Sequence, residues 1–202
     1  ASSFLPNSTF SYWTDGTFVY YRHEKIPKAD ILSFQPYEYF FAKDNQRCYS
    51  GPRILKNADA KTFEVLNFAY AKDKNKIWTV TGGFNVKDLK NFEVCDSGKY
   101  SLGMQKMSLP ETKELFYELF VPYGFAKDKL AVYYYDYQGK IKIIKNADPP
   151  SFMSLDDGHF AKDKNYVFCG RHIVKNAQLN SWEKLQEKFF YSKDRTNVFY
   201  FH

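Results

Sequence analysis

The sequence predicts a mainly β fold of about six repeated antiparallel β-hairpins, each extended into a three-stranded meander, with one inserted α-helix. Three observations predict it. A short pattern centred on an aspartate recurs along the chain, its period is near 29 residues, and Phe, Tyr and Trp make up 20% of the 202 residues. Aromatic side chains suit the half-buried surface of a sheet, and a fixed period of this length indicates one supersecondary unit stacked on its copies.

The pattern has an aromatic residue three positions before the aspartate, a small apolar residue four positions after it, and another aromatic residue at the fifth. The six frame aspartates are Asp15, Asp44, Asp73, Asp128, Asp163 and Asp194. The first three are spaced by 29 residues, and each is followed 15 residues later by a closing aspartate. Each frame aspartate therefore marks one repeat.

Within a repeat, an aromatic-led strand runs into a polar turn and a second strand leaves it, which predicts a β-hairpin. A second turn and a short third strand follow, such as residues 53–55. The closing aspartate predicts a single helical turn, because Asp59 or Asp148 would cap its free amides and Pro149 suits its first position. An aromatic residue then pins this turn onto the sheet; these residues are Phe34, Phe63, Phe92, Phe152 and Trp182.

The period breaks after Phe92, since 55 residues separate Asp73 from Asp128. Residues 100–103 resemble a remnant of the pattern with glycine in place of the aspartate. Residues 108–121 predict the inserted helix, because Ser108 and Glu111 form a capping box and apolar side chains follow at helical spacing. We expect this helix to pack on the sheet.

The last repeats are irregular. The fourth has five extra residues near 135–139, and the fifth has Gln178 as its closing residue and predicts a short amphipathic helix through Trp182, Leu185 and Phe189. The sixth is a half repeat, residues 191–202. No linker is visible, so we expect residues 1–202 to form a single domain; the alternative is two lobes, 12–98 and 124–202, joined by a helical insertion at 99–123.

Charge and apolar content restrict the partners and the location. The net charge is +6, but lysines accompany nearly every frame aspartate, so the charge is spread along the chain and nucleic acid is not expected as a partner. No apolar run approaches the roughly 18–20 residues of a membrane span. The chain begins at Ala1 rather than Met, which fits removal of a signal peptide. We expect a periplasmic or otherwise extracytoplasmic protein, with a cytoplasmic location as the alternative.

Candidate catalytic and metal-binding residues are few. An Asp-Lys-Asn turn offers two oxygen ligands where calcium takes about six to eight, so the frame aspartates are expected to cap turns. The four histidines are scattered, and none forms a metal motif. Cys48 and Cys169 hold packing positions of the repeat and are expected to be buried; one disulfide among the three cysteines remains open. A dyad of Cys169 with His159 or His172 is the weaker interpretation, so we expect neither an enzyme nor a cofactor.

Phe125-Ala126-Lys127-Asp128-Lys129, Lys162-Asp163-Lys164-Asn165-Tyr166 and Val132-Tyr133-Tyr134 resemble the bacterial DKNYY repeat family. The similarity covers nearly the whole chain except residues 99–123. It implies a β-rich repeat protein of Gram-negative and related bacteria, often exported, with no established catalytic residues. Some DKNYY-like proteins resemble immunity partners encoded near secreted antibacterial toxins.

Departures from a repeat are where recognition residues are expected, because the repeat positions serve folding. The sequence therefore predicts a protein-binding site on the inserted helix and on the loop of the fourth repeat. Its residues are Glu111, Lys113, Glu114, Tyr117, Glu118, Tyr135, Asp136 and Tyr137. We expect a non-catalytic protein-binding module, most specifically an immunity-type inhibitor that neutralises a secreted toxin. The alternative is an exported structural or carbohydrate- or envelope-binding β-repeat protein with no toxin partner.

Overall fold

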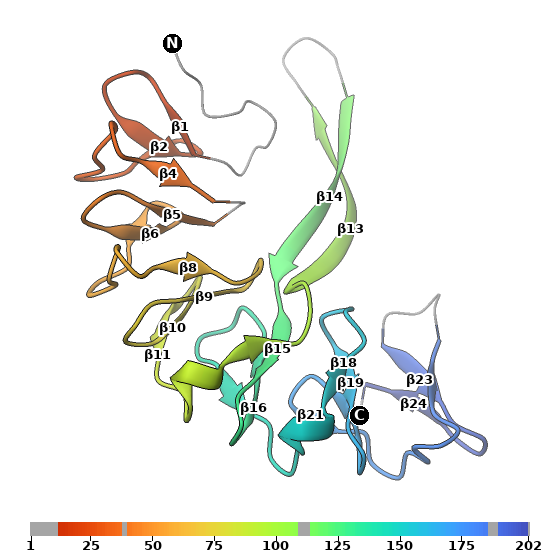
Figure 1. Cartoon of the computed structure of the whole chain (residues 1–202). Helices are drawn as coiled ribbons and strands as arrows, with labels where there is room; N and C mark the ends of the chain where they lie inside the picture. The colour runs from red at the N-terminus through yellow and green to blue at the C-terminus, as the bar shows by residue number, and fades with distance from the viewer. Residues whose placement is uncertain (1–11, 38–39, 109–113, 186–189, 202) are drawn as a thin grey trace. The chain divides into compact units, whose positions relative to one another are not determined.

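The computed structural model describes residues 12–37, 40–108, 114–185 and 190–201 (Figure 1). The described chain consists of short antiparallel strands and two 3₁₀ turns, and no α-helix occurs in it. It divides into two compact bodies: one contains the residues up to Asn91 with 138–140, and the other contains residues 92–137 with those from Ile141 onward. No described helix is long and apolar enough to cross a membrane.

The first body contains three sheets of consecutive strands. The first sheet pairs β1 (Tyr12–Thr14), β2 (Val19–Tyr21) and β3 (Glu24–Lys25). The second has the order β4 (Gln35–Pro36), β5 (Phe41–Lys43), β6 (Cys48–Ser50) and β7 (Arg53–Ile54). The third has the order β8 (Glu64–Val65), β9 (Tyr70–Lys72), β10 (Ile77–Thr79) and β11 (Gly82–Phe84), and the 3₁₀ turn η1 (Leu89–Asn91) follows it.

The second body continues the same plan. One sheet has the order β12 (Glu93–Val94), β15 (Gly124–Lys127), β16 (Val132–Tyr135) and β17 (Lys142–Ile143), and the turn η2 (Pro149–Ser151) follows. The next has the order β18 (Met153–Ser154), β19 (Phe160–Lys162), β20 (Val167–Cys169) and β21 (His172–Ile173). The last pairs β22 (Glu183–Lys184), β23 (Tyr191–Lys193) and β24 (Val198–Tyr200). A separate two-stranded sheet pairs β13 (Lys99–Ser108) with β14 (Glu114–Pro122).

The predicted meander of each repeat is confirmed, and each of the later repeats has one strand more than predicted. The extra strand is a two-residue segment that directly follows the pinned turn, as Glu64–Val65 follows Phe63. It pairs with the first strand of the next hairpin, so Glu64 lies opposite Lys72 and Val65 opposite Ala71. Two residues are too few to show the alternation that identifies a strand in a sequence.

The predicted inserted helix is wrong. Residues 114–122 form β14, which pairs with β13 in a register that sets Met104 opposite Glu118 and Lys106 opposite Phe116. The spacing of Leu115, Phe116, Leu119 and Phe120 fits a helix, but the aromatic content of this segment favours a strand once a partner strand is available. Glu111 of the predicted capping box lies outside the described residues.

Residues 100–103 are part of β13 and not a remnant of the repeat. The register shifts between Ser101 and Met104, and Gly103 has φ +80° at this point, which is the geometry of a β-bulge. The second predicted helix is also wrong. Glu183–Lys184 forms β22, and Phe189 lies outside the described residues.

The frame aspartates cap turns, as predicted. Oδ1 of Asp73 accepts hydrogen bonds from the amides of Asn75 and Lys76 at 2.8 and 2.9 Å. Oδ2 of Asp73 accepts from the indole of Trp78 at 2.9 Å. All the other frame aspartates accept the same two amide bonds, from the residues two and three positions later. In repeats two to six the aspartate is buried, so these bonds satisfy carboxylate oxygens that are mostly removed from water.

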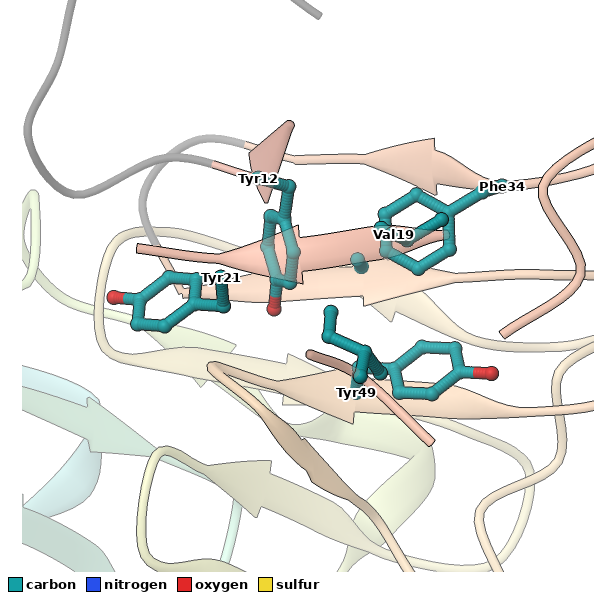
Figure 2. Packing of buried hydrophobic residues seen from close by; sticks show 7 residues of the cluster. Tyr12, Val19, Tyr21, Phe34 and Tyr49 are labelled. Atoms are coloured by element: carbon teal, nitrogen blue, oxygen red, sulfur yellow. The ribbon is translucent and has the colours of Figure 1, made fainter. Parts of the chain in front are cut away.

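Within each body the core lies between successive repeats. The ring of Phe34 packs 5.3 Å from Tyr12 of the first repeat and 5.4 Å from Tyr49 of the second, measured between centroids. Figure 2 shows these three rings around Val19. The prediction that Cys48 and Cys169 are buried is confirmed; all three cysteines are free, and burial raises the pKa of both buried thiols to about 12.

Candidate functional site

The long hairpin β13–β14 is inserted in the turn that leads into the hairpin of the fourth repeat. The third and fifth repeats show this turn without an insertion. In the third repeat, Asn67 Oδ1 accepts hydrogen bonds from the amides of Ala69 and Tyr70 at 2.9 and 2.8 Å. In the fifth repeat, Asp157 Oδ1 accepts the equivalent bonds from the amides of His159 and Phe160. Each side chain thereby fixes the turn that leads into the hairpin.

Asp96 makes the same turn across the insertion. It accepts hydrogen bonds from the amide of Gly98, two residues on, at 3.0 Å and from the amide of Phe125 at 2.8 Å. Phe125 therefore occupies the place that Tyr70 has in the third repeat. The 55 residues between Asp73 and Asp128 exceed the 29-residue period by 26, which is the length of residues 99–124.

Two glycines bring the ends of this insertion together. A Cβ atom on Gly124 would lie 3.0 Å from Cα of Gly98 and would collide with the Asp96 carboxylate. Only glycine fits this contact without displacing its neighbours. The insertion therefore leaves and re-enters the repeat at almost one point. The strand before it, β12, pairs directly with β15, the strand that begins at its end.

Asp96 is an unusual carboxylate because it is mostly enclosed. Burial raises its pKa to about 6, although the amide of Phe125 and the hydroxyl of Ser154 both donate to it and oppose the rise. Asp156 nearby raises the pKa further. The carboxylate joins β18 to the base of the hairpin through Ser154, at 3.0 Å.

The hairpin pairs with no other described strand and exposes large apolar side chains. Cross-strand partners share one face of a sheet, so Met104 and Phe116 lie on the same face as Lys106 and Glu118. Met104 is 63% exposed and Phe116 is 58% exposed. Leu102, next to the bulge, is 48% exposed. We name this surface of Leu102, Met104, Lys106, Phe116 and Glu118 the hairpin surface.

A cavity of about 260 Å³ lies at the base of the hairpin. Lys184 forms an ion pair with Asp157 Oδ2 at 2.5 Å on its wall, and the ring of His159 stands edge-on to Tyr100 at 4.4 Å. Burial lowers the pKa of His159, so its imidazole is neutral at pH 7. The remaining lining residues are Ser97, Lys99, Ser101, Phe120 and Asp156. The volume is below the roughly 300–1,000 Å³ of small-molecule sites.

The described lining of this cavity includes His159 but no cysteine. The thiol of Cys169 in the same body has its pKa raised to about 12 by burial, which keeps it protonated at neutral pH. No group of three His, Cys, Asp or Glu side chains within the described ranges is arranged to hold a metal ion. The arrangement can receive a polar or aromatic side chain and supplies both a cation and a carboxylate to it.

The eight predicted binding residues are placed differently from one another. Glu111 and Lys113 lie outside the described residues, while Glu114, Tyr117 and Glu118 are on β14. The Glu118 side chain is exposed and accepts a hydrogen bond from Ser101 Oγ. The residues missed from the sequence are Leu102, Met104, Lys106 and Phe116 of the hairpin surface. The sequence predicted a helix and a repeat remnant in these segments, so the β pairing that brings the four residues together was not predicted.

In the loop of the fourth repeat, Tyr135 is fully buried, which contradicts its expected exposure. It ends β16, where the strand packs into the core. Asp136 is ion-paired with Lys142 at 2.5 Å, and Tyr137 is 44% exposed with φ +61°. Of these three residues, Tyr137 presents the most side chain to a partner.

The comparisons with known proteins agree with the repeat architecture. No curated protein and no solved structure matches the chain. A family model described as the DKNYY family matches residues 41–202. The match includes five of the six frame aspartates, together with the inserted hairpin. The resemblance noted in the sequence is confirmed: the chain belongs to the DKNYY family.

Proposed function

We propose that the chain is a non-catalytic protein-binding module, most specifically an immunity-type inhibitor that binds and neutralises a secreted bacterial toxin. The observation that carries the proposal is the hairpin surface. It belongs to the insertion of residues 99–124, which departs from the repeat, and it exposes Met104 and Phe116 among charged neighbours. Exposed apolar side chains rimmed by charge are typical of protein interfaces.

The geometry of β13–β14 favours recognition by strand addition or by packing on one face. The outer edges of this two-stranded sheet pair with no described strand, so strand addition by an extended segment of a partner is one mode of recognition that the hairpin allows. An isolated two-stranded hairpin is marginally stable in water. Binding of a partner would bury its apolar side chains and would stabilise it.

The repeat aromatics weigh against the carbohydrate-binding alternative. Sugar and base recognition by aromatic rows needs exposed rings. In the second to fifth repeats the two aromatic residues of the frame are all buried, as in Phe41 with Tyr49 and Phe160 with Phe168. These rings hold the repeats together and are not a binding platform.

The proposed location is the periplasm or another extracytoplasmic space, where a secreted toxin would be met. Fractionation of the native host, followed by immunodetection in the periplasmic and cytoplasmic fractions, tests this. Recovery only in the cytoplasmic fraction would contradict it.

The experiment that tests the function is co-expression of the chain with each product of the neighbouring open reading frames. Size-exclusion chromatography and calorimetry then measure complex formation. We expect one product to bind, and we expect the double substitution Met104→Ser and Phe116→Ser to weaken its binding at least about tenfold, as for central interface residues. Met153→Ser is the matched control, because Met153 is 57% exposed on β18 and is not part of the hairpin surface.

Two outcomes would contradict the proposal. Either no neighbouring product binds, or the hairpin variant and the Met153 variant bind the partner equally well. Circular dichroism of both variants before the binding measurement ensures that a loss of binding is not a loss of fold.

A further inference from the structure

A second surface of the second body, separate from the hairpin, has the features of a binding groove. It has a volume of about 570 Å³ and lies between β17 and β21, the outer strands of two successive sheets. Its lining includes Ile143, Lys145, Arg171, His172, Ile173 and Lys175. We name it the basic groove. The volume is within the range of about 300–1,000 Å³ that is typical of ligand sites.

The positive charge of this groove is not neutralised. Lys145, Arg171 and Lys175 are all exposed, and no acidic residue lines the groove. None of the three cations forms an ion pair with a described carboxylate. Arg171 Nε donates to His172 Nε2 at 3.2 Å, which sets the guanidinium beside the imidazole on one wall.

The repeat explains only part of this charge. Lys145 and Lys175 hold equivalent positions after the third strand, as Lys56 does in the second repeat. Lysines beside edge strands discourage pairing between molecules, and this role accounts for all three. It does not account for Arg171, which stands where the second and third repeats have Pro52 and Thr81. The positive charge that Arg171 adds to the groove is therefore a departure from the repeat.

The floor of the groove is aliphatic. Ile143 is 51% exposed, and Ile173, its equivalent in the next repeat, is half-buried beside it on the lining. No aromatic ring lines the groove, so it offers no stacking platform for bases. Duplex DNA-binding proteins commonly contact about 6–10 phosphates, which is more than three fixed cations can neutralise.

We propose that the basic groove binds an extended acidic segment of a protein, with aliphatic side chains on Ile143 and Ile173 and carboxylates at Lys145, Arg171 and Lys175. The proposal goes beyond the function assigned to the hairpin surface and shares no residue with it.

The probe is a short fluorescein-labelled peptide of alternating Glu and Leu, and fluorescence anisotropy measures its binding to the full chain. We expect binding that weakens as salt rises. The double substitution Arg171→Glu and Lys175→Glu should weaken this binding at least about tenfold. It replaces two cations that attract the carboxylates of the peptide with two anions that repel them. Lys56→Glu is the matched control, since it reverses an equivalent lysine outside the groove and should leave the affinity within about twofold.

Further controls separate this proposal from its alternatives. The Met104→Ser and Phe116→Ser variant should bind the peptide unchanged, so failure of the hairpin proposal is distinguishable from failure here. A peptide of alternating Lys and Leu should not bind. Equal losses in the groove variant and the Lys56 variant would overturn the proposal, as would absence of binding. Tighter binding of an oligodeoxythymidine that the same substitutions abolish would also overturn it and would assign the groove to nucleic acid.

Discussion

The backbone amide of Asp59 donates a hydrogen bond to Oδ2 of Asp73 at 2.8 Å, and this bond joins the closing turn of one repeat to the first turn of the next. The same bond recurs from Asp30 to Asp44, from Asp148 to Asp163 and from Gln178 to Asp194. Because the donor is a backbone amide, the bond survives the replacement of the closing aspartate by glutamine in the fifth repeat. These four frame aspartates therefore cap their own turns and also hold the preceding repeat.

The first prediction concerns this double role. Asp73→Ala should lower the free energy of unfolding by about 2–4 kcal/mol, because three backbone amides and the buried Trp78 indole lose their acceptor. Asp15→Ala is the matched control at the same repeat position. Asp15 is exposed, so water replaces its bonds and the loss should be smaller. Urea denaturation of both variants measures the loss of unfolding free energy. Equal losses would contradict the double role of Asp73 in its own turn and in the preceding repeat.

The second prediction compares two valines at one position of the repeat. Val167 is 1% exposed, whereas Val198 in the last repeat is 69% exposed. Val167→Ala should cost about 2 kcal/mol of unfolding free energy, since it removes buried methyl groups and leaves a cavity. Val198→Ala should change stability by less than about 0.5 kcal/mol. Thermal or urea unfolding distinguishes them, and a large loss at Val198 would mean that another surface covers this position in solution.

Much of the fold was predictable because each repeat is a short local unit with turn chemistry visible in the sequence. The frame aspartate, its two aromatics and the capped closing turn at Asp148 all follow from the spacing of a few residue types. The insertion was not predictable by the same means. Residues 114–122 fit a helical stripe as well as a strand, and only the pairing with residues 99–108 decides between them.

One signal for the insertion was present and was missed. Asp96 lies 29 residues after Asn67, at the same repeat position, so the turn before the hairpin is intact on one side of the break. Recognising Gly98 and Phe125 as the continuation of that turn would have placed the insertion at residues 99–124. The burial of Tyr135 and the grouping of Arg171 with Lys145 depend on contacts between repeats, which the sequence of one repeat does not contain.

The third prediction concerns the titration of Asp96. Its pKa is raised to about 6 when folded, against about 3.9 in an unfolded chain, so the folded state holds this proton more tightly. The stabilisation by this group is complete below about pH 4 and is lost as the pH rises to about 6. Asp96→Asn should remove this pH dependence. Asn67 accepts both amides of its turn on Oδ1 alone, whereas Asp96 accepts from Gly98 on Oδ1 and from Phe125 on Oδ2, so the single oxygen of asparagine should also lower the stability by an amount that does not change with pH.

Urea denaturation between pH 4 and 7 measures the difference in unfolding free energy between the Asp96→Asn variant and the natural sequence. Carboxylates that do not interact with Asp96 titrate equally in both proteins and cancel in this difference. Asp96→Ala is the control, because it removes the acceptor as well as the charge and should destabilise the protein at every pH. A difference that does not change between pH 4 and 6 would contradict the raised pKa.

The last prediction uses the geometry of the insertion. Deletion of residues 99–124 joins Gly98 to Phe125, which restores the 29-residue spacing of the frame aspartates and leaves Asp96 bonded as Asn67 is in the third repeat. The ends of the removed segment already lie in contact at Gly98 and Gly124, so the junction needs little rearrangement. We expect a folded protein with cooperative urea unfolding that no longer binds the partner of the hairpin surface.

Deletion of residues 96–121 is the matched control. It has the same length and restores the same period, but it replaces Asp96 with Pro122 and so removes the acceptor for the Phe125 amide. This variant should unfold at clearly lower urea than the first deletion, because a buried turn loses its acceptor and gains a residue of restricted φ. If the two deletions are equally unstable, the insertion does not enter the repeat at Gly98, and Asp96 does not close its base.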